Sequence, residues 1–489
     1  MELQVKQKRI DEDQFLKMRQ DALSQWPTGK EVNLEEAIQY QKGLPESKSF
    51  LKVVQKLRKE GKTVVFPRGG TPILEDEIKL CKTLYESGVP LIPVTSDSYT
   101  RLFQLKKVQE GLEESIRLGK PMLNGYPIIN HGVKNTRKVV ESCPGAFNPR
   151  LSRLSQPLGA EIAFASGMTA ISSSPSFLFS NYEKNARLED NIRSSQYVFR
   201  LMGYYAERGP IFSFDNHGMQ PCGVFPYSVN IATAIADALI AAEQGVKSII
   251  PMVNFEGHMA QDIAWIKAAR KLMREYLDKF GYKDVLIPGS FGCQIPLFPS
   301  PQNMGEAFGA LGYTAVVAAL AQVETVFVRT IDEAAGVPTA EAHALSYRAA
   351  NWILEIVRSQ KIEIDMKEIE TEEKLTEMEV RAILDKVLEM GNGDIVLGCI
   401  KGVEAGILDS PFCPNVNVQD KVLGVRDVKG ACRYVEFGNL PLPKEVKEFH
   451  REKIREREKA EGRKMDYMVA VEDLWAFSKG KMLGQPNPA

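Results

Sequence analysis

The chain has 489 residues, and its 62 lysines and arginines balance 63 aspartates and glutamates to leave a net charge of −1. This balance gives no sign of a nucleic-acid partner or of binding to an anionic membrane surface. At a typical domain size, the length would allow about three domains, although a barrel can be one larger domain.

Seven cysteines are scattered along the chain, and no pair has the CxxC spacing. An odd, scattered set argues against a disulfide framework and against a cysteine zinc site. The N-terminal segment MELQVKQKRIDEDQF is charged, and no apolar stretch approaches the roughly 18 residues of a membrane span. We therefore expect a soluble, cytoplasmic protein with reduced thiols.

The predicted elements fall into a helical start followed by alternating strands and helices. Residues 1–60 are typical of a helical arm. From there to about residue 330, short β-rich runs alternate with longer helical patterns, which indicates β/α units and a parallel sheet. The predicted strands are 63–67, 89–94, 126–130, 168–173, 210–214, 247–253, 284–289 and 323–329.

Eight strands alternating with helices match a TIM (β/α)8 barrel, although a doubly wound open sheet gives similar local patterns. We favour the barrel and place it at residues 61–360, after the N-terminal helical arm at 1–60. Residues 361–489 are predicted to form a C-terminal α+β extension, which begins with a charged amphipathic stretch. The charge-dense segment KEVKEFHREKIREREKAEGRK within it is expected to be a helix with a solvated face.

Arginines follow the first three predicted strands. Arg68 comes after the first run, Arg101 after the second and Arg150 after the third. In a barrel the strand ends open onto one face, which carries the active site, so we expect these side chains to converge. A guanidinium pairs bidentately with a carboxylate, and three of them would suit a dicarboxylate held at both ends. For any single arginine, an ordinary ion pair or helix-end contact is the alternative.

Other motifs carry weaker signals. Gly69 and Gly70, behind Arg68, and Asn124 in LNGYP are turn formers that could also approach a ligand. The five histidines show no HExxH and no short two-histidine spacing, so a protein-built metal site is not expected. We interpret His217 as a pocket or core histidine. There is no GxSxG, Walker A motif or GxGxxG after a strand, which leaves no support for a serine hydrolase, a P-loop NTPase or a Rossmann enzyme.

Eight segments, taken together, resemble the epsilon subunit of glutamate mutase. They are WPTGKEVNLEEAI (26–38), DSYTRL, LNGYPIINHGVK, AEIAFASG, LIAAEQGVKSI, AAGVPTAEA, LDKVLEMGNGD and RYVEFGNLP. The segments occur in order over nearly the whole chain, including the arm and the tail, and as a set they are highly specific.

The resemblance implies the catalytic large subunit of an adenosylcobalamin-dependent isomerase, methylaspartate mutase. Its reference reaction converts L-glutamate into threo-3-methylaspartate by radical rearrangement. It also implies a TIM barrel and a separate small cobalamin-binding sigma subunit, whose D-x-H-x-x-G motif supplies the histidine ligand of cobalt. The segment DNHGMQ at 215–220 lacks the last glycine of that motif, as expected for the large subunit. The family's assembly would give a heterotetramer of two large and two small chains.

The resemblance also assigns roles to single residues. The family's substrate-binding arginines match Arg68, Arg101 and Arg150, and a substrate-contacting tyrosine matches Tyr182. Its cofactor contacts match Gly70 and Asn124, and in VRTIDEAAGV they match Glu333, Val337 and Arg329. Arg329 stands where the family has lysine, which keeps the charge and alters the geometry.

The sequence departs from the family around the fourth predicted strand. Ser172 replaces a glutamate that contacts the substrate's amino group, and Asn181 replaces a proline near the cofactor. Leu178 and Leu151 replace a tyrosine and a histidine. A buried ammonium without its carboxylate is disfavoured by on the order of a few kcal/mol.

These departures leave three interpretations open. The substrate is a dicarboxylate without an α-amino group, or a larger one. Alternatively, Glu183 or Asp215 reaches the ammonium in a plain glutamate mutase. A third interpretation is a non-catalytic scaffold subunit, against which the three retained arginines and Glu333 argue. A cobalamin-independent, aldolase-like barrel would need a Schiff-base lysine or metal ligands at strand ends, and none stands out.

Overall fold

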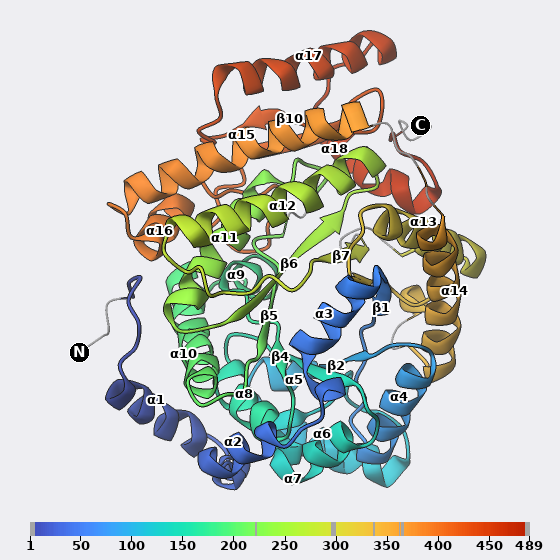
Figure 1. Cartoon of the computed structure of the whole chain (residues 1–489). Coiled ribbons are helices and arrows are strands. Elements are labelled where there is room, and N and C mark those ends of the chain that lie inside the picture. The colour runs from blue at the N-terminus through green and yellow to red at the C-terminus, as the bar shows by residue number, and fades with distance from the viewer. Residues whose placement is uncertain are drawn as a thin grey trace.

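The computed structural model describes residues 5–220, 223–294, 300–335, 338–360, 362 and 366–484, whose arrangement is shown in Figure 1. The described part of the first 60 residues contains α1 (Glu12–Ser24), α2 (Leu34–Lys42) and α3 (Phe50–Glu60). Each helix begins after a side-chain cap, because Asp11, Asn33 and Ser49 accept a hydrogen bond from a backbone N–H of the first turn. The short 3-10 helices η1 (Pro27–Glu31) and η2 (Glu46–Lys48) connect them.

Six parallel strands form a curved sheet in the order β1-β8-β7-β6-β5-β4. They are β1 (Val64–Phe66), β4 (Ala170–Ile171), β5 (Ser213–Asn216), β6 (Ser248–Phe255), β7 (Phe291–Gln294) and β8 (Thr325–Phe327). A separate parallel pair consists of β2 (Leu91–Thr95) and β3 (Ala146–Arg150). β2 and β6 are buried along their whole length. Their sequences are therefore mostly continuous apolar runs rather than alternating apolar and polar residues.

Backbone contacts join the strand pair to the neighbouring strands on both of its sides. Arg150 and Ser172 form an isolated parallel bridge between β3 and the end of β4. On the other side, the N–H of Thr95 donates to the carbonyl of Gly69 at 2.8 Å. One cluster of buried apolar residues contains side chains of both sheets and of α3. The two sheets therefore share an interior core.

Helices lie around the strands (Figure 1). Between strands they are α4 (Leu74–Glu86), α5 (Ser98–Arg101), α6 (Leu105–Leu118), α7 (Ile128–Glu141), α8 (Gln156–Ala165), α9 (Pro175–Tyr182), α10 (Leu188–Ala206), α11 (Ser228–Glu243), α12 (Met259–Lys279) and α13 (Met304–Leu320), and after β8 follow η3 (Glu333–Ala335) and α14 (Ala340–Ser359). α11 is buried on nearly every side, and Ile231, Ile235 and Leu239 contribute to the core. No helix within the described ranges is long and apolar enough to cross a membrane.

The predicted strand at 126–130 is wrong. These residues lead into α7, and the third strand is β3, which ends at Arg150. α7 has a kink at Gly132, whose φ of +67° is not helical, and after it the buried residues Val133, Thr136 and Val140 recur at helical spacing. A short apolar run fits the first turn of such a helix as well as it fits a strand.

The predicted strand at 284–289 is misplaced. Leu286 forms only an isolated bridge with Ser248, and the seventh strand, β7, begins at Phe291. Pro288 has no N–H to donate to a ladder, so regular pairing starts after it. The other six predicted runs overlap the strands of the structure.

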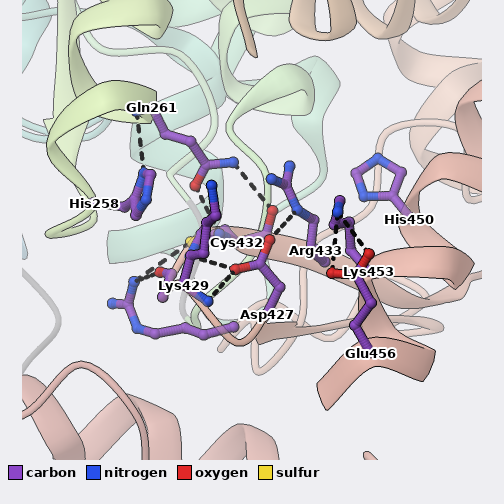
Figure 2. A network of polar contacts seen from close by, with 12 residues as sticks. His258, Gln261, Asp427, Lys429, Cys432, Arg433, His450, Lys453 and Glu456 are labelled. Carbon is purple, nitrogen blue, oxygen red and sulfur yellow. Dashed lines mark hydrogen bonds and ion pairs between the residues drawn. The ribbon is translucent and has the colours of Figure 1, made fainter. Parts of the chain in front are cut away.

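The C-terminal segment packs against α11 and α12. It contains α15 (Met366–Met390), α16 (Ile395–Glu404), the antiparallel strands β9 (Val422–Arg426) and β10 (Cys432–Phe437), α17 (Lys444–Glu461), α18 (Tyr467–Ala476) and η4 (Phe477–Lys479). The amide of Gln261 in α12 forms two hydrogen bonds with the backbone of Cys432, at 2.6 and 3.2 Å (Figure 2). Beside it, Arg433 pairs with Asp427 and with Glu372 of α15. Buried polar contacts therefore tie this hairpin to the outer helices.

The charge-dense helix α17 has a buried face as well as the predicted solvated one. Val446, His450, Ile454 and Arg457 are buried at helical spacing. Arg457 donates to both carboxylate oxygens of Asp473 in α18, at 2.6 and 3.0 Å, and both side chains are fully buried. This pair connects α17 to α18.

Replacing Arg457 by methionine should lower the free energy of unfolding by about 3 to 5 kcal/mol, because Asp473 would stay buried without its cation. The matched variant Arg455→Met removes an exposed pair with Glu448 on the same helix and should leave stability almost unchanged. Urea denaturation of the two variants measures the difference. Equal losses of unfolding free energy in the two variants would show that the buried pair contributes no more to stability than the exposed pair.

Candidate functional site

Four arginines line a cavity of about 230 Å³ at the carboxyl ends of the strands, which we call the inner cavity. They are Arg68 after β1, Arg101 at the end of α5, Arg150 at the end of β3 and Arg329 after β8. Asn181 and Tyr182 of α9 line the same space. The structure therefore brings together the three arginines that were expected to converge, from segments far apart in the sequence.

Aromatic rings and one carboxylate hold the guanidinium of Arg150. Its central carbon lies 5.2 Å from the ring centre of Phe66 and 5.3 Å from that of Phe327. One terminal nitrogen is 3.8 Å from Oδ2 of Asp215. Both kinds of contact stabilise the cation. Two buried nitrogens of this guanidinium nevertheless lack a hydrogen-bond partner among the described residues, which is typical of a group that a ligand completes.

The other three arginines are held in different ways. Arg101 lies over the ring of Tyr182, 5.5 Å from its centre. Arg68 is 3.9 Å from the carboxylate of Glu333, and because its side chain is 46% exposed this attraction is weak. Arg329 donates to the hydroxyl of Ser300 at 2.8 Å, and burial lowers the pKa of Arg329.

Ser172, Asp215 and His217 form a buried polar cluster beside Arg150. The hydroxyl of Ser172 donates to Oδ2 of Asp215 at 2.7 Å, and Nε2 of His217 lies 3.6 Å from the same oxygen. Burial acts to raise the pKa of Asp215, but His217, Arg150 and Ser172 together outweigh it and lower that pKa below its usual range. Asp215 is thus a charged carboxylate. Neither it nor Ser172 is among the described residues that line the cavity.

A second cavity of about 370 Å³, which we call the outer cavity, adjoins the first. The two share Arg68, Thr95 and Arg101. The outer cavity is also lined by residues expected to contact a cofactor, namely Gly70, Asn124 and Glu333. A ligand with two parts could therefore extend from one space into the other.

The backbone of Thr95, at the end of β2, fixes the boundary between the cavities. Its N–H donates to the carbonyl of Gly69, and its carbonyl accepts from the N–H of Tyr126, both at 2.8 Å. A Cβ on Gly70 would lie 2.3 Å from the carbonyl oxygen of Thr95, so only glycine fits there. The loops that carry Arg68 and Asn124 are thereby held against the same strand end.

The remaining predicted residues have distinct positions. Asn124 accepts from the N–H of Ser98 and donates to its hydroxyl, both at 2.8 Å, so it also fixes the start of α5. Leu151, where the sequence departs from the family, lines the inner cavity. Val337 lies outside the described residues. Glu183, considered as an ammonium partner, pairs with Arg153 at 3.4 Å.

Sequence reasoning did not assign several lining residues, among them Thr95, Phe177 and Gln220. His217 was interpreted as a pocket or core histidine, and it both lines the inner cavity and is buried. Thr95, His217 and Gln220 directly end or follow a buried strand, which is the signal that identified the arginines. Applied to polar residues of every kind, that rule would have found them.

Comparison with known proteins decides the family. The model of the methylaspartate mutase E chain family matches residues 44–486. The chain belongs to this family. The glutamate mutase epsilon subunit of Treponema denticola is 37% identical over 482 residues, which covers 98% of this chain and 99% of that subunit. The subunit of the same name from Yersinia enterocolitica is 38% identical over 485 residues, 99% of this chain and all of its own length. A more distant one, from Haloarcula marismortui, is 34% identical over 480 residues, 98% of this chain and 96% of its own.

Membership in the E chain family makes this protein a component of a mutase, and its similarity extends over the whole chain rather than over the cavity region alone. The family resemblance inferred from scattered segments is therefore confirmed.

Asp237 of α11 anchors α9, the helix that carries Asn181 and Tyr182. Its two carboxylate oxygens accept hydrogen bonds from the hydroxyls of Ser174 and Ser176, at 2.5 and 2.8 Å. Burial raises the pKa of Asp237 to about 7 in spite of these bonds. Because this value exceeds the usual 3.8, the contribution of Asp237 to stability is full below about pH 4 and is lost as the pH rises through about 7.

The pH dependence of stability should therefore differ between the unaltered chain and Asp237→Asn. Between about pH 5 and about pH 8 the unaltered chain should lose a few kcal/mol of unfolding free energy relative to the variant, because only the aspartate must ionise while buried. Urea denaturation at the two pH values measures this. Asp284→Asn is the control, since the hydrogen bond from Lys247 lowers the pKa of Asp284 and keeps it ionised throughout. If the unfolding free energy changed equally with pH in the unaltered chain and in Asp237→Asn, the raised pKa of Asp237 would be contradicted.

Proposed function

We propose that the chain is the catalytic large subunit of an adenosylcobalamin-dependent isomerase, a carbon-skeleton mutase that acts on a small dicarboxylate. Its family supports the mutase assignment. The observation that carries the substrate class is the inner cavity, in which four arginines surround about 230 Å³. A small acid with two carboxylates supplies two pairs of oxygens, and each pair matches the fork of a guanidinium.

The reference reaction is the conversion of L-glutamate into threo-3-methylaspartate by radical rearrangement. A carbon fragment moves between neighbouring atoms of the substrate, so both ends of the molecule must be fixed while the bonds change. Arg150, with 18% of its side chain exposed, provides a partly buried anchor, and Arg68 and Arg101 provide anchors at the boundary with the outer cavity. The rings of Phe66 and Phe327 give Arg150 an apolar surrounding on one side, which strengthens the pairing of charges.

The outer cavity suits the adenosyl part of adenosylcobalamin. The carboxylate of Glu333 can accept hydrogen bonds from ribose hydroxyls, and the amide of Asn124 can both donate and accept. Gly70 keeps side-chain atoms out of the space, and Asn181 and Arg329 would meet the cofactor from the inner side. When bound, the cofactor supplies the radical that removes hydrogen from the substrate.

The cobalt ligand is assigned to a partner, a small cobalamin-binding sigma subunit. The relatives' name, epsilon subunit, supports a multi-subunit mutase. We propose a heterotetramer of two large and two small chains in the cytoplasm. The described cysteines are free thiols, which supports the location.

A second candidate substrate is a dicarboxylate without an α-amino group. The described lining of the inner cavity contains no aspartate or glutamate, and the hydroxyl of Ser172 is used by Asp215. An ammonium group in this space would find an anionic partner only by reaching Oδ1 of Asp215, which is buried without a hydrogen-bond partner among the described residues. The alternative of a non-catalytic scaffold is disfavoured, because a scaffold has no use for four arginines clustered around one cavity.

We also propose that the strands close into a complete (β/α)8 barrel at residues 61–360, between a helical arm at 1–60 and a C-terminal α+β extension at 361–489. The bridge between Arg150 and Ser172 and the hydrogen bond from Thr95 to Gly69 support closure on both sides of the β2-β3 pair. The parallel pairing of β1 with β8 supports it between the first and last strands.

Anaerobic mixing of the full chain with a family sigma subunit, adenosylcobalamin and L-glutamate tests the function. We expect formation of 3-methylaspartate, measured by chromatography, and an organic-radical EPR signal, both requiring all the components. A complex that binds partner and cofactor but converts neither L-glutamate nor an amino-free dicarboxylate would refute the catalytic role.

The variant Arg150→Met should weaken dicarboxylate binding at least roughly 30-fold, because it removes a buried, charge-assisted anchor. Arg153→Met is the matched control: Arg153 is three positions away, pairs with Glu183 and is not among the described lining residues, so the affinity should stay within about twofold. Isothermal titration calorimetry on the holo complex gives both values. Similar losses in the two variants would argue against a clamp at Arg150.

A further inference from the structure

The outward side of α14 carries large apolar side chains that remain exposed in the described part of the chain. Buried and exposed residues of this helix recur at helical spacing, and Leu345, Trp352 and Ile356 lie on the exposed side. Trp352 alone is 66% exposed. Single exposed apolar residues are common, but three large ones on one side of one helix indicate a contact surface. We call these three residues the α14 stripe.

The neighbouring helix α13 continues this apolar surface. Its residues 307–320 include no charged side chain, although Gly309 is exposed and Val316 is only partly buried. A Cβ on Gly312 would lie 3.3 Å from the side chain of Ile353 in α14, so this side of α13 faces α14. Gly309 lies one turn earlier on the same side, and a Cβ there would meet no described atom within 4 Å. Beside the α14 stripe, α13 therefore leaves open space that side chains of an approaching chain can enter.

Two opposite charges flank the centre of the α14 stripe. Arg348 lies one turn before Trp352 and Glu355 lies one turn after it, and both side chains are exposed. Neither has an ion-pair partner among the described residues. If a second α14 packs antiparallel across a twofold axis near Trp352, each Arg348 faces the Glu355 of the other copy. The apolar centre and its flanking charges are thus complementary to themselves.

The α14 stripe lies away from the place that a cofactor-carrying partner must cover. Ala340 and His343, at the start of α14, line the outer cavity. Trp352 lies more than two turns beyond His343, or about 13 Å along the helix. In Figure 1, α14 forms an outer edge of the barrel region, on the side opposite to α1 and α10. A cobalamin-binding subunit has to cover the cavities, so this outer side is available for a different contact.

We propose that α14 and the adjoining side of α13 form the surface through which two copies of this chain associate, with Trp352 at the twofold axis. This inference rests on the proposed assembly of two large and two small chains and names where its large chains meet. Aromatic residues and arginine are enriched at protein interfaces, and a central tryptophan supplies much of the binding energy. The pairing of Arg348 with Glu355 on each side of the axis fixes the antiparallel register.

Sedimentation velocity of the full chain over a series of concentrations, without a partner subunit, tests this surface. We expect the mass of two chains. Trp352→Glu should raise the dissociation constant of the dimer at least about 30-fold, because it places two like charges at the centre of an apolar contact. Ile116→Glu is the matched control: Ile116 of α6 is 62% exposed, and its replacement should leave the dissociation constant within about twofold.

Reversal of the two charges tests the twofold pairing itself. Arg348→Glu and Glu355→Arg should each raise the dissociation constant about tenfold, because like charges then face each other at both pairs. The double variant restores opposite charges and should bring the constant back to within about threefold of that of the unaltered chain. The two residues are about two turns apart in one helix, beyond the i,i+4 spacing at which side chains pair within a chain. A rescue would therefore report a contact between copies.

Three results would overturn the assignment of this surface. A chain that stays monomeric would refute it, and if the chain stays monomeric with a family sigma subunit bound, the heterotetramer is refuted as well. A Trp352→Glu chain that dimerises as tightly as the unaltered chain would refute the surface and leave the assembly intact. Loss of sigma binding by a Trp352→Glu chain that still dimerises would assign the α14 stripe to the small subunit instead. Formation of 3-methylaspartate is measured separately, so a failure of the catalytic proposal leaves this inference unaffected.

Discussion

Four guanidinium groups around one small cavity repel one another, and the fold must offset this repulsion without cancelling the positive field that attracts an acid. It does so mainly with aromatic faces, which stabilise a cation without bringing a net negative charge. Arg101 lies over a tyrosine ring, and Arg150 lies over the rings of Phe66 and Phe327. Carboxylates are used sparingly: Glu333 is at a distance from Arg68, and Asp215 is behind Arg150. The cavity therefore keeps its positive character.

Backbone hydrogen bonds, rather than charge pairs, keep the arginine-bearing segments together. Thr95 bonds through its N–H to the loop after β1 and through its carbonyl to the segment before α7. Buried backbone groups are costly to leave unpaired, so the segments cannot separate under the repulsion of their side chains without losing these bonds. Gly70 permits the close approach, because a side chain there would collide with the carbonyl of Thr95. The rigid boundary between the two cavities is thus a property of the main chain.

Much of the fold could be predicted because buried strands and helix faces are local patterns, and six strands were located in this way. The third was missed, since the run at 126–130 holds only the short start of α7 and helical spacing appears after the kink at Gly132, at Val133 and Val140. The convergence of the arginines followed from the rule that strand ends meet on one face. The contact of Ser172 with Asp215 did not, because the partners are 43 positions apart and only the folded chain brings them together.

The position of a carboxylate, and not merely its presence, determines what the cavity binds. A carboxylate that faced the ligand would neutralise one arginine and provide a partner for an ammonium group. Asp215 instead lies within the wall, where one of its oxygens is engaged by Ser172, His217 and Arg150 together. Its other oxygen, Oδ1, is buried without a hydrogen-bond partner among the described residues, although Asp215 is not among the described lining residues. Glu333 and Asp215 offset only part of the positive charge of the arginines, so the bound acid supplies further negative charge.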